Sequence, residues 1–300
     1  MTRLQPDDIG HIADRLSADD QKLLARTGRT LRGIACHAVQ LKEEEIADRV
    51  ARIRTAVVPI SWGEGLIAGF SEATGAILQH LGFQTFVTRH MDVSGMAEAF
   101  EKGADIIFLS DDERFVALNA VCGRVVDNAT ATGKGFVAGL DLMAGGLKGK
   151  DVLVIGCGPV GFSAAMALAQ YEARVSVHDL DTRRSEDLAR ELGKTLNRPV
   201  RIKSDLKSAL SRHRLIVEAT NSGGIIHEPD LAPGTYIAAP GMPLGLSWAA
   251  TQKMSARLLH DPLQLGVATM GLEACKTILE KNAGSTPGPE MDDDGRKETG

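Results

Sequence analysis

The chain has 300 residues, of which 43% are hydrophobic and 24% charged, and its formal net charge is −5. This composition is typical of a soluble globular protein, and the length is enough for two domains with separate cores. The acidic net charge argues against general nucleic-acid binding. No apolar run reaches the length of about 18 residues that a membrane span needs, and the N-terminus lacks a secretory apolar core. We therefore expect a cytoplasmic protein with no nucleic-acid or membrane partner.

The cysteines and histidines give no metal-binding pattern. The four cysteines are widely scattered, and the eight histidines form no close pair and no H-E-x-x-H motif. Structural zinc sites need ligands in close pairs such as C-x-x-C. The sequence therefore predicts no metal site.

The first half of the chain predicts helices followed by a small α/β domain. Residues 7–26 and 31–54 have helical periodicity, and strands are expected at 56–60, 84–88 and 104–109 with helices at 66–81 and 93–102 between them. Strands that alternate with helices indicate a parallel sheet. We predict a substrate-binding domain over residues 1–129.

Polar residues follow each of these three strands, where the ligands of parallel sheets bind. A cleft with carboxylates suits a charged, amine-bearing molecule, and the carboxylates can act as ligands or as bases. Alternatively, Asp92, Ser94 and Asp112 are N-caps of the helices that follow. One cap does not need two adjacent acids, so Asp111 and Asp112 favour a functional role. The candidates are Ser61, Glu64, Asp92, Ser94, Asp111 and Asp112.

A helix of small residues, from about residue 128 to 147, is expected to bridge the two domains. Its position places Asn128 and Thr132 near the interdomain cleft. Alternatively, Asn128 or Thr130 serves only as the helix cap.

The apolar run 152–155 leads directly into a G-x-G-x-x-G motif and a helix of small residues, which is the pattern of a dinucleotide-binding turn. Gly156 allows the tight turn, Gly158 lets a pyrophosphate approach the backbone, and Gly161 lets helix and strand pack closely. Free N–H groups and the helix dipole then face the phosphates. The cofactor-binding turn comprises Gly156, Cys157, Gly158, Pro159, Val160 and Gly161.

Asp179 ends the next strand and indicates NAD as the cofactor. An acid at this position bonds the ribose hydroxyls and repels a 2′-phosphate. Arg183 and Arg184 follow closely, and they are the features that would suit NADP instead.

Further strands at 200–202, 215–221, 236–239 and 257–259 complete a Rossmann domain over residues 130–282. Loops after these strands place Ala219, Thr220, Pro240 and Gly241 beside the cofactor. A closing helix at 265–281 is expected to pack back across the domains. Residues 283–300 have almost no apolar content and are predicted to be disordered. The fold class is therefore α/β, with a C-terminal Rossmann domain and a smaller N-terminal helical and α/β domain.

Motifs spread over residues 1 to about 280 resemble the PylD family of pyrrolysine biosynthesis dehydrogenases. In the first half they are Leu4, Phe70-Ser71-Glu72, Asp92-Val93-Ser94-Gly95, Asp111-Asp112 with Phe115 and Asn119, Asn128, and Thr132-Gly133. In the second half they are the dinucleotide-binding turn, Glu218-Ala219-Thr220, Pro240-Gly241-Met242-Pro243 and Asp261-Pro262-Leu263.

The resemblance implies NAD-dependent oxidation of the terminal amine of 3-methylornithyl-Nε-lysine, followed by ammonia release and ring closure to pyrrolysine. It implies that Asp111 and Asp112 bind the amine or accept a proton. It further implies that Ser61, Glu64, Ser94 and Asn128 line the substrate under Leu4, and that the protein is a homodimer. The family pattern has a neutral amide where this chain has Glu64.

Two other functions fit parts of the pattern. Two-domain dehydrogenases of the shikimate or methylene-tetrahydrofolate type commonly place a lysine in the cleft, and here only Lys102 and Lys134 are nearby. A protein that senses NAD without catalysis would bind the cofactor and show no turnover.

Overall fold

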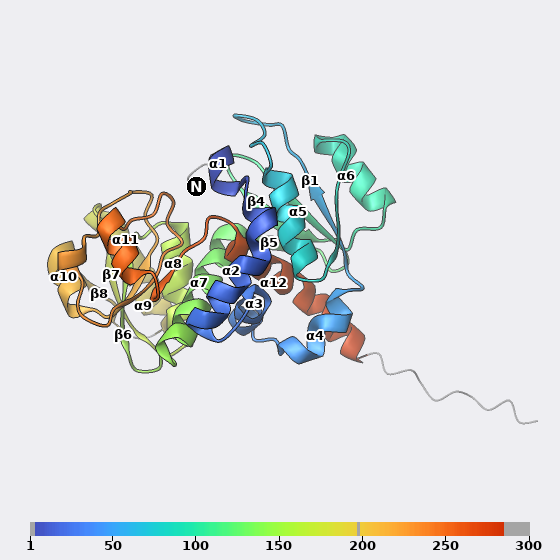
Figure 1. Cartoon of the computed structure of the whole chain (residues 1–300). Helices are drawn as coiled ribbons and strands as arrows, with labels where there is room; N and C mark the ends of the chain where they lie inside the picture. Colours follow the sequence, from blue (N-terminus) through green and yellow to red (C-terminus); the bar gives the residue numbers. More distant parts are fainter. Residues whose placement is uncertain (1–3, 197–198, 285–300) are drawn as a thin grey trace, which may run out of the picture.

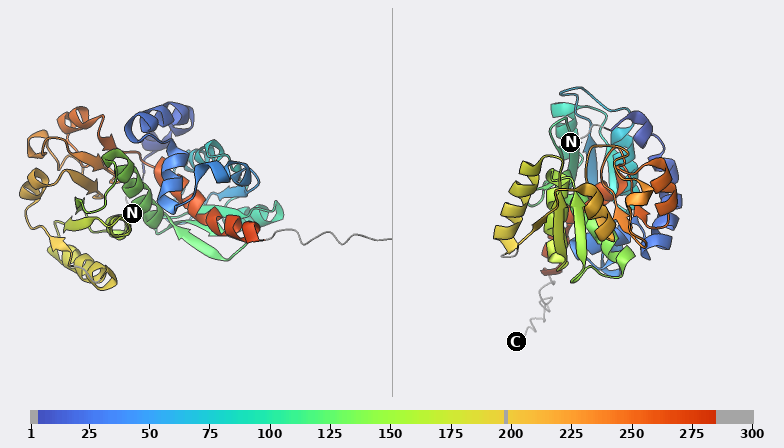
Figure 2. Two further views of the ribbon diagram at one scale, coloured as in Figure 1. Left: turned by 90° about the horizontal axis from the view of Figure 1, so that it is seen from below. Right: turned by 90° about the vertical axis from the view of Figure 1, so that its left-hand side faces the viewer.

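The computed structural model describes residues 4–196 and 199–284 (Figure 1). Two sheets, each flanked by helices, form the two halves of the chain, and the long helix α7 (Asn128–Ala144) lies between them (Figure 2). The α/β fold class confirms the prediction from the sequence.

Four helices precede the first strand: α1 (Pro6–Ile9), α2 (Ile12–Thr27), α3 (Leu31–Val39) and α4 (Glu43–Val50). The single helical stretch predicted for residues 31–54 is wrong, because α3 ends at Gln40, which has a left-handed φ of 58°. Such a residue closes a helix by turning the chain out of the helical path. The apolar faces of α2, α3 and α4 contribute to the core through residues such as Leu16, Ile34 and Ile46.

The N-terminal sheet contains the three predicted parallel strands and two that the sequence did not reveal. Strands β1 (Arg54–Val58), β2 (Gln84–Val87) and β3 (Ile106–Ser110) alternate with α5 (Phe70–His80) and α6 (Asp92–Glu101). The additional strands β4 (Phe115–Asn119) and β5 (Arg124–Asp127) are antiparallel and extend the sheet in the order β2-β1-β3-β4-β5. Asp111 and Asp112 therefore lie in a hairpin turn rather than before a helix.

The second sheet has the strand order of a doubly wound nucleotide-binding fold. Its strands are β6 (Asp151–Ile155), β7 (Arg174–His178), β8 (Arg201–Ile202), β9 (Leu215–Glu218), β10 (Tyr236–Ala238) and β11 (Leu258–Leu259). They are parallel in the order β11-β10-β9-β6-β7-β8, so the first strand lies inside the sheet beside the fourth. The helices around it are α8 (Pro159–Gln170), α9 (Thr182–Leu196), α10 (Leu206–Arg212) and α11 (Trp248–Met254), with a 3-10 turn at Glu228–Asp230.

The last helix, α12 (Gln264–Gly284), packs back onto the N-terminal half, as predicted. The buried Asn119 side chain donates to the Ala274 carbonyl at 2.7 Å, and Lys134 on α7 pairs with Glu273 at 3.2 Å. The helix includes residues 283 and 284, so the predicted tail begins too early, and residues 285–300 lie outside the described part of the chain. None of the described helices is long and apolar enough to cross a membrane.

Candidate active site

The glycines of the dinucleotide-binding turn are required by close backbone contacts. Gly156 has a φ of +90°, and a Cβ there would lie 2.7 Å from the Ala219 carbonyl oxygen. A Cβ on Gly161 would lie 1.8 Å from the Gly156 carbonyl oxygen. Helix α8 therefore approaches the turn as closely as the motif predicts.

Gly158 is the N-cap of α8, and a Cβ added there would meet no protein atom within 4 Å. The half-buried backbone of Gly158 is thus unobstructed where the first N–H groups of α8 lack partners within the helix. These N–H groups and the positive end of the helix dipole suit a pyrophosphate. The turn fits a dinucleotide, which Gly156–Gly161 would hold by its phosphates.

Asp179 lies at the carboxyl end of β7, beside this turn. Its carboxylate accepts hydrogen bonds from the backbone N–H groups of Cys157 at 2.7 Å and Asp181 at 2.9 Å. Arg184 faces Asp181 at 3.9 Å and is exposed. Burial raises the pKa of the Cys157 thiol to about 11, so it stays neutral at pH 7 and is no nucleophile.

Glu218 ends β9 fully buried and organises the cofactor-side loops, a role that sequence reasoning did not assign. Its carboxylate accepts from the Thr220 backbone N–H and hydroxyl at 2.8 and 2.6 Å, and from the Gly245 N–H at 3.1 Å. A Cβ on Gly241 would lie 2.6 Å from a Glu218 oxygen. Burial raises the pKa of Glu218, and the bonds from Thr220 oppose this. The sequence feature that could have indicated this role is an acid at the end of an otherwise apolar strand.

Asp92 connects the ends of β1 and β2. Its carboxylate accepts from the Ser61 N–H at 2.8 Å and the Ser61 hydroxyl at 2.7 Å, and these bonds lower the pKa of Asp92. The N-cap of α6 is Met91, so the alternative in which Asp92 or Ser94 caps this helix is wrong. Asp92 also has a left-handed φ of 53°, a conformation uncommon outside glycine. Ser94 is exposed on the first turn of α6.

The two adjacent acids have different surroundings. Asp112 accepts from the Glu64 N–H at 2.5 Å, and its carboxylate lies so close to Gly63 that a Cβ there would clash at 1.9 Å. Asp111 accepts from the N–H groups of Glu113 and Arg114 at 2.8 and 2.7 Å, which closes the β3–β4 hairpin turn. Neither acid caps a helix.

Ser61 and Asp92, and Glu64 and Asp112, are therefore in contact at the edge of the N-terminal sheet where β1, β2 and β3 end. Asp111 and Asp112 border a cavity of about 40 Å³ that Phe70, Ser71 and Phe115 also line. A cavity of this size holds a few water molecules. The roles of these residues in catalysis and substrate binding stay predictions.

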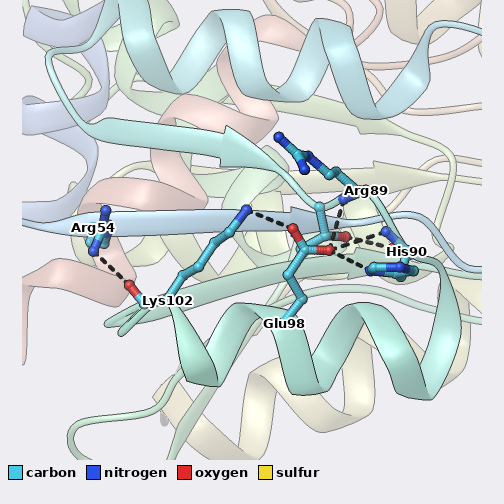
Figure 3. Close-up of polar contacts among 6 residues, drawn as sticks. Arg54, Arg89, His90, Glu98 and Lys102 are labelled. Carbon is cyan, nitrogen blue, oxygen red and sulfur yellow. Dashed lines mark hydrogen bonds and ion pairs between the residues drawn. The ribbon is translucent and has the colours of Figure 1, made fainter.

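The loop before α6, which contains Arg89 and His90 and leads to Asp92, is held by a charged network around Glu98 on α6 (Figure 3). One Glu98 oxygen accepts from Lys102 Nζ at 2.6 Å, and the other accepts from the backbone N–H groups of Arg89 at 2.9 Å and His90 at 3.1 Å. These bonds, led by the one from Lys102, lower the pKa of Glu98 to about 2. A Cβ on Gly95 would lie 2.4 Å from the His90 carbonyl oxygen, so Gly95 lets α6 approach the same loop.

Asn128 and Thr132 lie at the start of α7, where the two halves meet. The Thr132 hydroxyl donates to Asn128 Oδ1 at 3.2 Å, and a Cβ on Gly266 of α12 would lie 2.6 Å from the Thr132 hydroxyl. The start of α8 is adjacent, because the Ser163 hydroxyl donates to the Thr130 carbonyl at 2.8 Å. The N-cap of α7 is Asp127, which accepts from the Ala129 N–H, so the caps expected at Asn128 or Thr130 are wrong.

Several predicted residues fall outside these contacts. Leu4 packs against the main core. Lys102 pairs with Glu98, and Lys134 pairs with Glu273 between α7 and α12. Both lysines are thus engaged with carboxylates, which weakens the interpretation based on a catalytic lysine. Within residues 4–196 and 199–284, no three His, Cys, Asp or Glu side chains are grouped to hold a metal ion.

Comparison with known proteins agrees with this division of the chain. Residues 8–126 match the family model of the pyrrolysine biosynthesis protein PylD, N-terminal domain, and residues 125–229 match the alanine dehydrogenase/PNT C-terminal domain. A pyrrolysine synthase of Methanosarcina barkeri is 33% identical over 90% of this chain and 97% of its own length. The chain belongs to the pyrrolysine synthase family. A second pyrrolysine synthase, from Methanosarcina acetivorans, is 30% identical over 90% of this chain and 98% of its own length.

Solved structures show the same fold at low sequence identity. Quinate dehydrogenase from Corynebacterium glutamicum, in complex with NAD, has a TM-score of 0.52 at 16% identity and covers 75% of this chain and 94% of its own. Shikimate dehydrogenase from Aquifex aeolicus has a TM-score of 0.51 at 16% identity and covers 75% of this chain and 91% of its own. The family and the second domain together support a dehydrogenase of pyrrolysine biosynthesis.

Proposed function

We propose that this chain oxidises the terminal amine of 3-methylornithyl-Nε-lysine with NAD and forms pyrrolysine. Membership of the pyrrolysine synthase family carries this proposal. The unobstructed backbone at Gly158 supports a bound dinucleotide, and the carboxylates of Asp92 and Asp112 support a substrate with amine groups.

The reaction balances without a further co-reactant. The terminal carbon of the methylornithine part loses a hydride and its nitrogen loses a proton, which gives an imine. The nicotinamide of a bound NAD supplies the hydride acceptor. The other ornithine amine then bonds to the imine carbon and ammonia leaves, so one C=N bond replaces another and the five-membered ring closes.

The residues of this chain would bind the amine and move protons. Hydride leaves only from a neutral amine, whose pKa is near that of lysine, about 10.4. A neighbouring carboxylate stabilises the cation, and it can accept the proton once the amine reacts. We assign Asp112 and Asp111 to this role. Ser61, Glu64, Ser94, Asn128 and Thr132 would line the substrate with Asp92, under Leu4.

Asp179 supports NAD over NADP, because its charge would repel a 2′-phosphate. It lies beside the turn, with its carboxylate 2.7 Å from the Cys157 N–H. Ala219, Thr220, Pro240 and Gly241 would contact the nicotinamide side of the cofactor. We further propose a cytoplasmic homodimer, the state implied by the family resemblance.

The test is NADH formation by the purified protein with NAD and synthetic 3-methylornithyl-Nε-lysine, with product mass measured alongside. We expect NADH together with pyrrolysine, and a loss of about 10²–10⁴-fold in turnover for Asp112→Asn or Asp111→Asn if that acid transfers the proton. Clear NAD binding without turnover would contradict the proposal and favour a non-catalytic NAD sensor.

A further inference from the structure

A second and larger cavity of about 330 Å³ lies between α2 and the turn that follows β11. On one wall, Arg15, Asp19 and Arg26 share a face of α2, because their spacings bring them to the same side of the helix. On the other wall are His260 and Asp261 of the Rossmann half. A ligand here would contact both halves of the chain.

Arg15 and Arg26 on the α2 wall, unlike Lys22 and Asp20 beside them, have no ion-pair partner in the described part of the chain. Lys22 pairs with Asp19 at 2.8 Å, and Asp20 bonds His80 at 2.6 Å. Within the described residues, Arg15 and Arg26 have no ion pair and no side-chain hydrogen bond. Arg26 is half-buried, and burial lowers the pKa of its guanidinium although Asp19 partly opposes this. Asp7, Asp8, Asp19, Asp20 and Asp261 also line the cavity, but none of them forms an ion pair with Arg26. A half-buried guanidinium that faces a cavity and has no carboxylate partner suits an anionic ligand.

The opposite wall belongs to the edge of the sheet where the cofactor loops lie. His260 Nδ1 is 2.7 Å from the Ala239 carbonyl at the end of β10. Asp261 Oδ1 accepts from the Leu263 and Leu265 N–H groups at 3.1 Å each, which fixes the turn that begins α12. The cavity therefore adjoins the carboxyl ends of β10 and β11, beside the place where the substrate would meet the nicotinamide.

We propose that this cavity binds the carboxylate end of the substrate, with the Arg26 guanidinium as its partner. The inference rests on the proposed function, in which the lysine part of the conjugate carries the free carboxylate. The reacting amine and this carboxylate lie at opposite ends of a long molecule. Holding the far end through Arg26 contributes binding energy that positions the reacting end.

The test compares two ligands: 3-methylornithyl-Nε-lysine and the same conjugate with its carboxylate converted to a carboxamide. Calorimetric titration of the full chain, saturated with NADH so that no turnover occurs, gives a Kd for each. We expect the wild type to bind the carboxylate form roughly tenfold to hundredfold more tightly. Arg26→Gln should lose this preference, whereas the control Arg52→Gln, at an exposed position outside the cavity, should keep it.

Two results would overturn the inference: a wild type without preference, or an Arg26→Gln variant that retains it. The inference would also be wrong if free L-lysine binds while the wild type binds the carboxylate and carboxamide conjugates equally tightly. The cavity would then bind the carboxylate of a separate amino acid. Thermal unfolding checks that Arg26→Gln folds, and Arg15→Gln tests the same wall if it does not. NADH formation by the wild type tests the proposed function separately. If neither conjugate binds, both proposals are wrong.

Discussion

Two alanine substitutions in the dinucleotide-binding turn should separate its structural role from its cofactor role. In Gly161→Ala, the new methyl would lie 1.8 Å from the Gly156 carbonyl oxygen, so α8 and the turn must separate. Overpacking of this kind costs about 1–3 kcal/mol, which corresponds to a Tm lower by about 2–5 °C in a chain of this size. In Gly158→Ala, the φ of −74° suits alanine and no protein atom lies within 4 Å of the methyl.

Gly158→Ala should therefore keep the free energy of unfolding within about 0.5 kcal/mol of wild type. It should nevertheless weaken NADH binding by roughly tenfold to hundredfold, because the methyl occupies the approach of the pyrophosphate to the backbone. Circular dichroism gives Tm, and NADH fluorescence titration gives Kd. A Gly158→Ala variant that binds NADH like wild type would refute the placement of the phosphates. An unchanged Tm for Gly161→Ala would refute the requirement for close packing.

Three further predictions each concern one titratable group. Asp179→Asn should raise the ratio of kcat/KM for NADP to that for NAD by about tenfold, since the repelling charge is removed while an acceptor oxygen remains, and an unchanged ratio would contradict the assigned role. The rate should rise with pH toward the amine pKa of about 10.4, so a flat or acidic kcat/KM profile would count against amine oxidation. The pKa of Glu98 is lowered from its usual 4.5 to about 2, so its contribution to stability is complete above pH 4.5 and is lost as the pH falls toward 2. Denaturant titrations between pH 6 and pH 2 should show this loss in wild type and a smaller one in Glu98→Gln.

The Rossmann half was predictable because its signals are local. An apolar strand, a glycine turn and a helix of small residues lie within twenty positions, and Asp179 ends the strand directly after them. Each of these features is defined by residues that are neighbours in the sequence, so the apolar pattern and the glycine motif were enough to predict them. The close contacts at Gly156 and Gly161 agree with the reasons inferred for those glycines.

The missed features depend on contacts between distant parts of the chain. Strand β4 is as long as β1 and β3, but the antiparallel pairing that defines it, such as that of Ile106 with Asn119, becomes visible only once the β3–β4 hairpin forms. Glu218 acquires its role from Gly245, 27 positions away, and Asp112 acquires its contact with Glu64 across 48 positions. Sequence periodicity carries no information about such partners.

The candidate acids also stabilise the loop that would surround the substrate, and this determines how their variants must be interpreted. Asp92 holds one end of the loop after β1 through Ser61, and Asp112 holds its middle through the Glu64 N–H. An asparagine at position 112 removes the charge but can still accept that hydrogen bond, whereas an alanine removes both. A turnover loss shared by Asp112→Asn and Asp112→Ala therefore indicates a role for the charge in catalysis. A loss seen only with alanine indicates that Asp112 acts by positioning the loop.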